Sequence, residues 1–232
     1  MQMINVTKPY RTGAARDFID EKLSRGIVSF SLAEIVKETG LSVVAARSQL
    51  LRLKDAVVRV SSRQQYFLIV QPQHRILGAP PVEWWLDEYF KWLGQPYYLA
   101  LLSAAAKYGS SHQAVQETEI ITQVPRRVMI IGRRRLRFFV KSTIDKTITQ
   151  QLPQAYAPLI VSTPESTVFD LVKYAERIGG LERVAETILP MLPMITSRAL
   201  KRVLEAENDV ATARRLSTVF ETIGAKDMLR WK

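Results

Sequence analysis

The chain has 232 residues, 47% of them hydrophobic and 24% charged, a composition typical of globular domains and unlike that of disordered chains. Its 33 Lys and Arg against 22 Asp and Glu give a net charge of +11, which favours polyanionic partners such as nucleic acids. The lack of cysteine excludes disulfides and thiolate metal sites. Since the sequence has neither a signal-peptide pattern nor a membrane-spanning apolar run, we expect a cytoplasmic protein that does not contact membranes.

The first 70 residues predict a set of short elements in a fixed order. Apolar spacing predicts a helix over residues 14–24, and the run 27–30 is typical of a strand. Ser31 stands three residues before Glu34, the capping-box spacing, so a helix should begin there and end at Gly40. Ser42 then suits the cap of a further helix, and the runs 57–60 and 66–70 predict a hairpin with a polar, basic tip. This order is that of a winged helix-turn-helix domain, which we assign to residues 1–75 as a DNA-binding domain.

Helical projection of the last helix of this set separates buried from exposed positions. It predicts that Val43, Ala46 and Leu50 point inward and that Ala45, Ser48 and Arg52 point outward. On DNA, Arg52 and Gln49 would reach base edges and Val44 a thymine methyl, while Arg47 and the serines at the helix starts would meet phosphates. The hairpin tip would reach phosphates or the minor groove. The predicted DNA-binding residues are Ser31, Ser42, Val44, Arg47, Ser48, Gln49, Arg52, Arg59, Ser62, Arg63 and Gln64.

The remaining residues, 76–232, predict a second domain of mixed structure. A linker rich in proline and glycine covers residues 71–81, and two helices should follow over 81–94 and 95–109. Strand-like runs then occupy residues 113–161, a helix capped by Ser162 or Thr163 follows, and three more helices end the chain. The fold class is therefore α+β: a winged helix-turn-helix domain joined to a mixed α/β domain with a small antiparallel-rich sheet and a helical C-terminal end.

Residues 126–146 form the most basic stretch, with eight Lys or Arg against one Asp. Apolar residues, among them Val128, Ile130, Leu136, Phe138 and Val140, alternate with the arginines, which is typical of a half-buried hairpin. A second nucleic-acid surface, a solvated hairpin and a patch for an acidic protein all fit this pattern. The candidate patch comprises Arg126, Arg127, Arg133, Arg134, Arg135, Arg137 and Lys141.

The sequence offers little that could catalyse a reaction. His74 and His112 fall in a linker and a loop, and no phosphate-cradling glycine loop occurs. A metal-dependent nuclease would need carboxylates on adjacent strands, for which Glu117 and Glu119 are the candidates, and no D/E-x-K triplet follows them on a strand. We therefore expect no enzyme activity, no metal site and no cofactor, with a nuclease kept as an alternative.

Two segments resemble a known family. "PYYLALLSAAAKYGSSHQAVQ", from Pro96, and "VSTPESTVFDLVKY", from Val161, are similar to the AbiEi antitoxins of type IV toxin–antitoxin systems. The positions that carry the resemblance are Tyr97, Tyr98, Leu102, Ala104, Gly109, Gln113, Thr163, Pro164, Glu165, Asp170 and Leu171. Tyr108 stands where such sequences often have a histidine, so no catalytic role passes to that position.

The resemblance implies a bacterial phage-defence protein with two functions. The winged helix would bind inverted repeats in double-stranded DNA of its own promoter and act as a transcriptional repressor. The C-terminal domain would antagonise a nucleotidyltransferase toxin, with or without direct contact between the two proteins. The alternative is a winged-helix regulator whose second domain senses a ligand or a partner.

Overall fold

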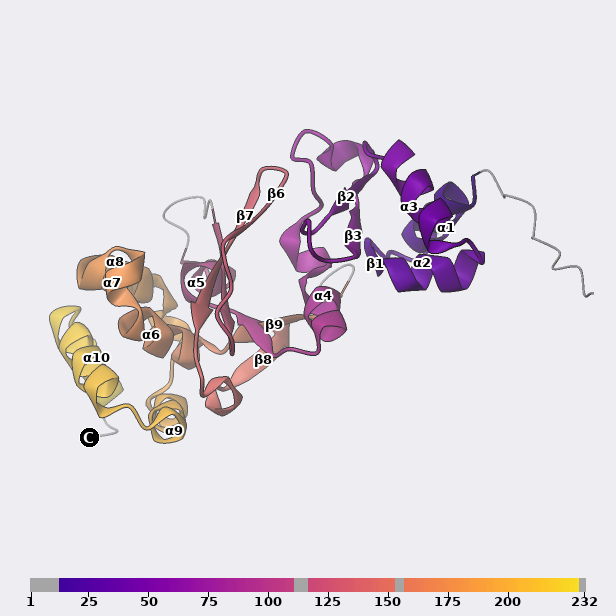
Figure 1. The fold of residues 1–232 in the computed structure, drawn as a ribbon. Coiled ribbons are helices and arrows are strands. Elements are labelled where there is room, and N and C mark those ends of the chain that lie inside the picture. The colour runs from indigo at the N-terminus through magenta and orange to yellow at the C-terminus, as the bar shows by residue number, and fades with distance from the viewer. Residues whose placement is uncertain (1–12, 111–116, 153–156, 230–232) are drawn as a thin grey trace, which may run out of the picture. The chain divides into compact units, whose positions relative to one another are not determined.

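A computed structural model describes residues 13–110, 117–152 and 157–229. These residues divide into two compact units (Figure 1). One unit comprises the described residues up to Trp85 together with Ile131–Arg133, and the other comprises Leu86–Ile130 and the described residues from Arg134 onward. The predicted boundary between residues 75 and 76 lies within the first unit and stays a prediction.

The first unit packs three helices and a three-stranded antiparallel sheet around one core. Its elements are α1 (Ala14–Ser24), β1 (Ser29–Ser31), α2 (Leu32–Thr39), α3 (Val43–Arg52), β2 (Val57–Arg59), β3 (Tyr66–Ile69) and the 3₁₀ helices Pro72–His74 and Val82–Trp84. The strand order is β1-β3-β2, with Phe30 opposite Phe67 and Val58 opposite Leu68. Within this core the Phe18 ring meets the Phe30 ring edge-on, and the Phe30 ring stacks on that of Phe67.

The local signals in this unit fold as the sequence predicts. Ser31 and Glu34 form the reciprocal capping box, and Gly40 ends α2 in the left-handed conformation that glycine adopts without strain. The Ser42 side chain accepts a hydrogen bond from the Ala45 N–H at 3.2 Å and so caps α3.

The second unit combines a six-stranded sheet with helices. Its helices are α4 (Leu86–Leu93), α5 (Leu101–Lys107), α6 (Pro164–Lys173), α7 (Ala175–Ile178), α8 (Gly180–Ile188), α9 (Ser197–Glu207), α10 (Val210–Thr222) and the 3₁₀ helices Ile144–Lys146, Leu189–Met194 and Lys226–Leu229. Its strands are β4 (Tyr97–Leu99), β5 (Glu117–Thr122), β6 (Met129–Ile131), β7 (Arg134–Val140), β8 (Thr149–Leu152) and β9 (Leu159–Ser162). Helix α6 lies at the centre of the helical part, in contact with α5, α7, α8, α9 and α10.

The sheet is mixed, a topology that the sequence analysis did not anticipate. Its strand order is β6-β7-β5-β4-β9-β8. The pairs β5–β7 and β4–β9 are parallel, while β4–β5 and β8–β9 are antiparallel. The sheet therefore has six strands and contains two parallel pairs besides its antiparallel ones, and β7 pairs parallel to β5 after the chain has passed through the edge strand β6. The α+β class and the helical C-terminal end are confirmed.

One predicted helix is partly a strand. The continuous helix expected over residues 95–109 is instead strand β4 followed by the short helix α5. Tyr97, Tyr98 and Leu99 are buried in the middle of the sheet, where aromatic and branched side chains favour strand structure over the helical spacing. The change from strand to helix occurs at Leu101, whose φ of 51° is unusual for a residue with a side chain.

Candidate functional site

Helix α3 presents an exposed surface on the first unit. Ala45, Ala46 and Leu50 are buried, whereas Val44 is 73% exposed and Leu51 is 76% exposed. Arg47, Ser48 and Arg52 are exposed as well, so these three predicted residues lie on the accessible side of the helix.

The predicted phase of α3 was wrong at two positions. Ala45 is buried rather than exposed, and Val43, expected inside, is 45% exposed. Helix α1 explains the difference, because the Ala15 N–H donates to Gln49 Oε1 at 3.0 Å and α1 therefore covers the side of α3 that carries Ala45 and Gln49. The observed orientation of α3 also places Leu51 on its exposed surface, a position that was not among the predicted DNA-binding residues.

Three predicted DNA-contacting side chains also hold the fold together. Gln49 accepts the hydrogen bond from α1, and Ser31 and Ser42 cap helices α2 and α3 through their hydroxyl oxygens. Hydroxyl groups at helix starts lie close to exposed backbone N–H groups, which is where phosphates bind in many complexes. The contacts of these residues with DNA stay predictions.

The turn between β2 and β3 carries the other predicted residues. The Arg59 guanidinium donates to the Ser62 carbonyl at 3.2 Å and lies 5.7 Å from the Phe67 ring centre. The Gln64 N–H donates to the Ser61 hydroxyl, which closes the turn, and Ser62 and Arg63 are exposed at its tip. The tip is therefore a small ordered loop that presents cationic groups.

The second basic patch does not form one surface. Lys141 is only 3% exposed and belongs to the interior of the second unit. Arg126 is half-buried, with its guanidinium 5.1 Å from the Phe90 ring centre and 5.9 Å from that of Phe138, and it donates to Gln95 Oε1 at 2.5 Å. Both residues belong to the candidate patch, and the burial of Lys141 corrects its inclusion there because its charge serves internal contacts.

The other arginines of the patch differ in their surroundings. Arg127, Arg133 and Arg135 are exposed, and the Arg135 Nε pairs with Glu117 at 2.5 Å. Arg134 and Arg137 are half-buried, and the Arg137 guanidinium donates to the Arg177 carbonyl at 2.9 Å. Leu136 and Phe138 are buried as expected, whereas Val128, Ile130 and Val140 are exposed. Val128 and Ile130 lie beside and in the edge strand β6, and Val140 is the last residue of β7.

The interior of the second unit contains a network of charged groups. The Lys141 Nζ donates to Asp170 Oδ1 at 2.9 Å and to Glu207 Oε1 at 2.5 Å, and the side chains of all three are at most 1% exposed. The Tyr98 hydroxyl donates to Asp170 Oδ2 at 2.8 Å, and the Thr147 hydroxyl donates to Glu207 Oε1 at 2.8 Å. The network joins the sheet to helices α6 and α9.

Burial shifts the pKa values of two groups in this network, Asp170 and Tyr98. It raises the pKa of the Asp170 carboxyl, while the neighbouring Lys141 ammonium acts in the opposite direction. Burial and the nearby Asp170 carboxylate raise the pKa of Tyr98 well above its usual value, so the phenol stays a proton donor. Sequence reasoning named Tyr98 and Asp170 from the family pattern but assigned no partner to either. Lys141 and Glu207 are 66 positions apart in the chain, so no short sequence motif indicates that they pair.

The two carboxylates proposed for a nuclease are engaged in the fold. Glu119 is buried and accepts the Leu102 N–H at 2.9 Å, and burial raises its pKa to about 7. Glu117 pairs with Arg135. Within residues 13–110, 117–152 and 157–229, no three His, Cys, Asp or Glu side chains lie where they could share a metal ion.

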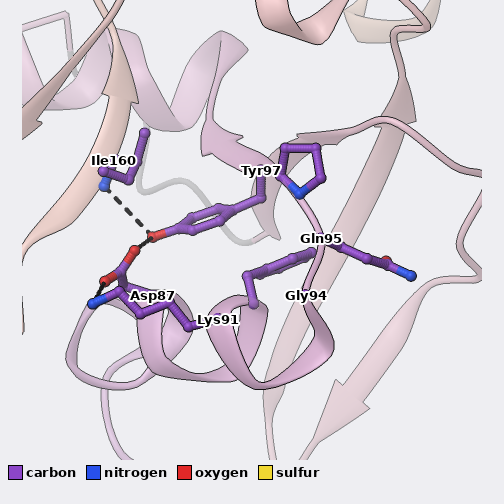
Figure 2. Close-up of a pocket in the computed structure, with 8 residues that line it drawn as sticks. Asp87, Lys91, Gly94, Gln95, Tyr97 and Ile160 are labelled. Carbon is purple, nitrogen blue, oxygen red and sulfur yellow. Dashed lines mark hydrogen bonds and ion pairs between the residues drawn. The ribbon is translucent and has the colours of Figure 1, made fainter.

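A shallow pocket of about 350 Å³ opens between α4 and the strands β4 and β9 (Figure 2). Tyr97 forms part of its wall, with the phenol donating to Asp87 Oδ1 at 3.0 Å, and Lys91 pairs with Asp87 Oδ2 at 2.7 Å. Phe90 stacks on Tyr97 at 4.5 Å between ring centres. The side chains of Asp87, Lys91 and Tyr97 thus bind one another in this pocket. His74 packs edge-on against Trp84, and His112 lies outside the described residues.

These features define an α+β protein in which a small helical unit with an exposed cationic helix accompanies a mixed-sheet unit held by a buried charge network. A family model of the AbiEi antitoxin C-terminal domain matches residues 98–222, more than half of the chain. The chain therefore belongs to the AbiEi antitoxin family, and the resemblance inferred from the sequence is confirmed. Tyr98 and Asp170, which meet in the charge network, both lie in the matched segment.

Comparison with solved structures supports the fold. The RV2827C protein from Mycobacterium tuberculosis is similar with a TM-score of 0.65 at 14% identity, over 94% of this chain and 81% of that one. At this identity the likeness shows the fold alone. An antigenic nucleotidyltransferase-like protein from Paracoccidioides brasiliensis matches at 12% identity over 60% of this chain and 95% of its own, with a TM-score of 0.40 too low to carry an argument. No curated protein sequence matches. No helix in the described part of the chain combines the length and apolar character that a bilayer crossing requires.

Proposed function

We propose that the chain is a DNA-binding antitoxin, which represses its own operon through the first unit and opposes a toxin through the second. The first unit has the order α1-β1-α2-α3-β2-β3 and a three-stranded sheet, and this order supports the arrangement of a winged helix-turn-helix domain. In that arrangement α3 is the recognition helix and the turn between β2 and β3 is the wing.

The observation that carries the proposal is the exposed surface of α3. Arg47 and Arg52 extend from a helix that contains no Asp or Glu, and its outer residues are open to solvent. Residues 1–75 contain twelve Lys or Arg against six Asp or Glu, a net charge of +6. A cationic helix with an accessible outer surface fits the major groove, because phosphates line both of its edges and base edges form its floor.

The antitoxin part of the proposal rests on the family. The matched model covers residues 98–222, which include most of the second unit and its charge network. We propose that this unit neutralises a nucleotidyltransferase toxin encoded in the same operon and that the first unit binds inverted repeats in the promoter. The proposal assigns no catalytic step and no cofactor to this chain.

A binding titration tests the DNA part. Fluorescence anisotropy would compare the duplex upstream of the chain's own gene with a shuffled duplex, at two salt concentrations. We expect tighter binding to the upstream duplex and weaker binding to both at high salt. Equal affinity for the two duplexes would contradict sequence-selective binding.

The Arg52→Ala variant tests whether α3 is responsible for selective binding to the upstream duplex. It should weaken binding to the upstream duplex more than binding to the shuffled one, because an arginine on a base edge contributes to selectivity. Arg25→Ala is a matched control, since Arg25 is exposed at the end of α1 and pairs with Glu21. Equal losses from Arg52→Ala on both duplexes would place Arg52 on phosphate.

A further inference from the structure

The outer surface of α3 carries an apolar stripe between two arginines. Val44 and Leu51 are 73% and 76% exposed, and the small Ser48 lies between them. The three residues are spaced i, i+4 and i+7, which places them on one line along the helix. Two large apolar side chains aligned in this way, with only a small serine between them, expose apolar area along one side of the helix, unlike a single surface leucine, which needs no explanation.

Charge borders this stripe on both sides. At 100° per residue, Arg47 lies about 60° to one side of Val44 and Arg52 about 80° to the other. The helix contains no carboxylate, so Arg47 on one side and Arg52 on the other are the charged groups that it places beside the stripe. Any partner of this surface must therefore combine an apolar centre with negative charge at both edges.

The DNA major groove has this combination when thymines line it. Thymine is the base that places a methyl group in the major groove, and the phosphates of the two strands flank the groove. We propose that Val44 and Leu51 read the 5-methyl groups of thymines, which makes Leu51 a specificity-determining residue. The two side chains are about 10 Å apart along the helix, comparable to three base steps of about 3.4 Å.

This inference rests on the proposed function and adds to it the chemistry by which the site is recognised. A second copy of the chain is the competing occupant of the stripe. In a symmetric contact the same surface meets itself, so the arginines of both copies would be brought together without a carboxylate of α3 to pair with. The charge of the surface therefore favours a polyanion over a second copy.

The test removes the methyl groups and nothing else. Footprinting on the upstream duplex first defines the bound site, and a second duplex then carries 2′-deoxyuridine in place of every thymine within it. Burial of one methyl group changes affinity about fourfold, so two buried methyls should make the uracil duplex bind about fifteenfold more weakly. Equal affinity of the wild-type chain for both duplexes, with selectivity over shuffled DNA retained, would overturn the inference and leave the proposed function standing.

Substitutions test whether Leu51 is responsible for the difference in affinity between the thymine and uracil duplexes. Leu51→Ala should bind the thymine duplex more weakly and lower the thymine-to-uracil affinity ratio about fourfold. Ile76→Ala is a matched control, because Ile76 is 79% exposed in the same unit, and it should leave affinity and ratio unchanged. Thermal unfolding of both variants at the wild-type temperature would show that their folds are intact.

The remaining outcomes also decide the question. An unchanged ratio in Leu51→Ala would remove Leu51 from base reading. Sedimentation could instead show that the chain is a dimer without DNA and that Leu51→Ala converts it to a monomer. If the thymine-to-uracil affinity ratio is unchanged in that variant, the stripe serves contact between copies and the inference is overturned. Absence of any selective binding would overturn both the inference and the proposed function.

Discussion

Replacing Lys141 by methionine should strongly destabilise the second unit. The substitution keeps most of the apolar stem but removes the ammonium that lies 2.9 Å from Asp170 and 2.5 Å from Glu207. Both carboxylates are at most 1% exposed, and among the described residues Lys141 is the cation that pairs with each of them. Breaking a buried ion pair by removing one member costs about 3–5 kcal/mol, a large part of the 5–15 kcal/mol typical of a whole domain.

The destabilisation should depend on pH in a defined direction. Lys141 acts to lower the pKa of Asp170, which burial raises, so its removal raises that pKa further. Between about pH 4 and this raised pKa, Asp170 keeps its proton in the folded variant. In the unfolded chain, where an Asp has an ordinary pKa of about 3.9, the same group has released it. Its stability should therefore fall as pH rises above about 4, and the difference from wild type should be larger at pH 8 than at pH 5.

Urea unfolding followed by far-ultraviolet circular dichroism measures this difference, with two transitions fitted if the two units unfold separately. Lys146→Met is the matched control, because Lys146 is exposed and its loss should change the free energy of unfolding by no more than about 0.5 kcal/mol. Adding Glu207→Gln to Lys141→Met should recover part of the loss, since one buried charge fewer remains. A Lys141→Met chain within about 1 kcal/mol of wild type at pH 8 would refute the role assigned to the network.

Further predictions concern both units. Because burial raises the pKa of Glu119 to about 7, the folded chain should lose up to about 3 kcal/mol of stability between pH 5 and pH 8, and Glu119→Gln should flatten this slope in urea titrations at each pH. Ser42→Ala should cost about 1 kcal/mol in thermal unfolding because α3 loses its cap, whereas Ser62→Ala at the exposed tip should have little effect. The full-length variant Arg47→Ala/Arg52→Ala should lose promoter repression in a reporter assay and still rescue cells from the toxin, and loss of rescue by a folded variant would contradict the division of functions.

The elements that the sequence predicted well are those specified by neighbouring residues. The capping box of Ser31 and Glu34 uses atoms three residues apart, and Gly40 ends its helix through its own backbone preference. The Thr163 cap and Pro164 likewise start α6 where the sequence indicated. In each case the information needed to place the boundary lies within one helical turn.

The features that were predicted wrongly depend on distant partners. The buried side of α3 is set by α1, which contacts Gln49 across 34 positions, so a projection of one helix could not fix the phase. Strand β4 forms because β5 and β9 pair with it on either side, although the same residues have helical spacing. Lys141 resembled its neighbouring surface arginines in the sequence, and its burial follows from two carboxylates on α6 and α9.

The residues that carry the family resemblance and those of the proposed DNA surface therefore differ in burial. Tyr98 and Asp170 are 72 positions apart and bind each other in the interior, so substitution at either would disturb a network that joins β4, α6 and α9. The α3 residues Val44, Arg47 and Leu51 are exposed, so the fold places little constraint on their side chains. An exposed surface tolerates substitution more readily than the buried network does. For this reason a resemblance carried by interior residues identifies the family, whereas the proposed recognition of DNA rests on the exposed side of α3.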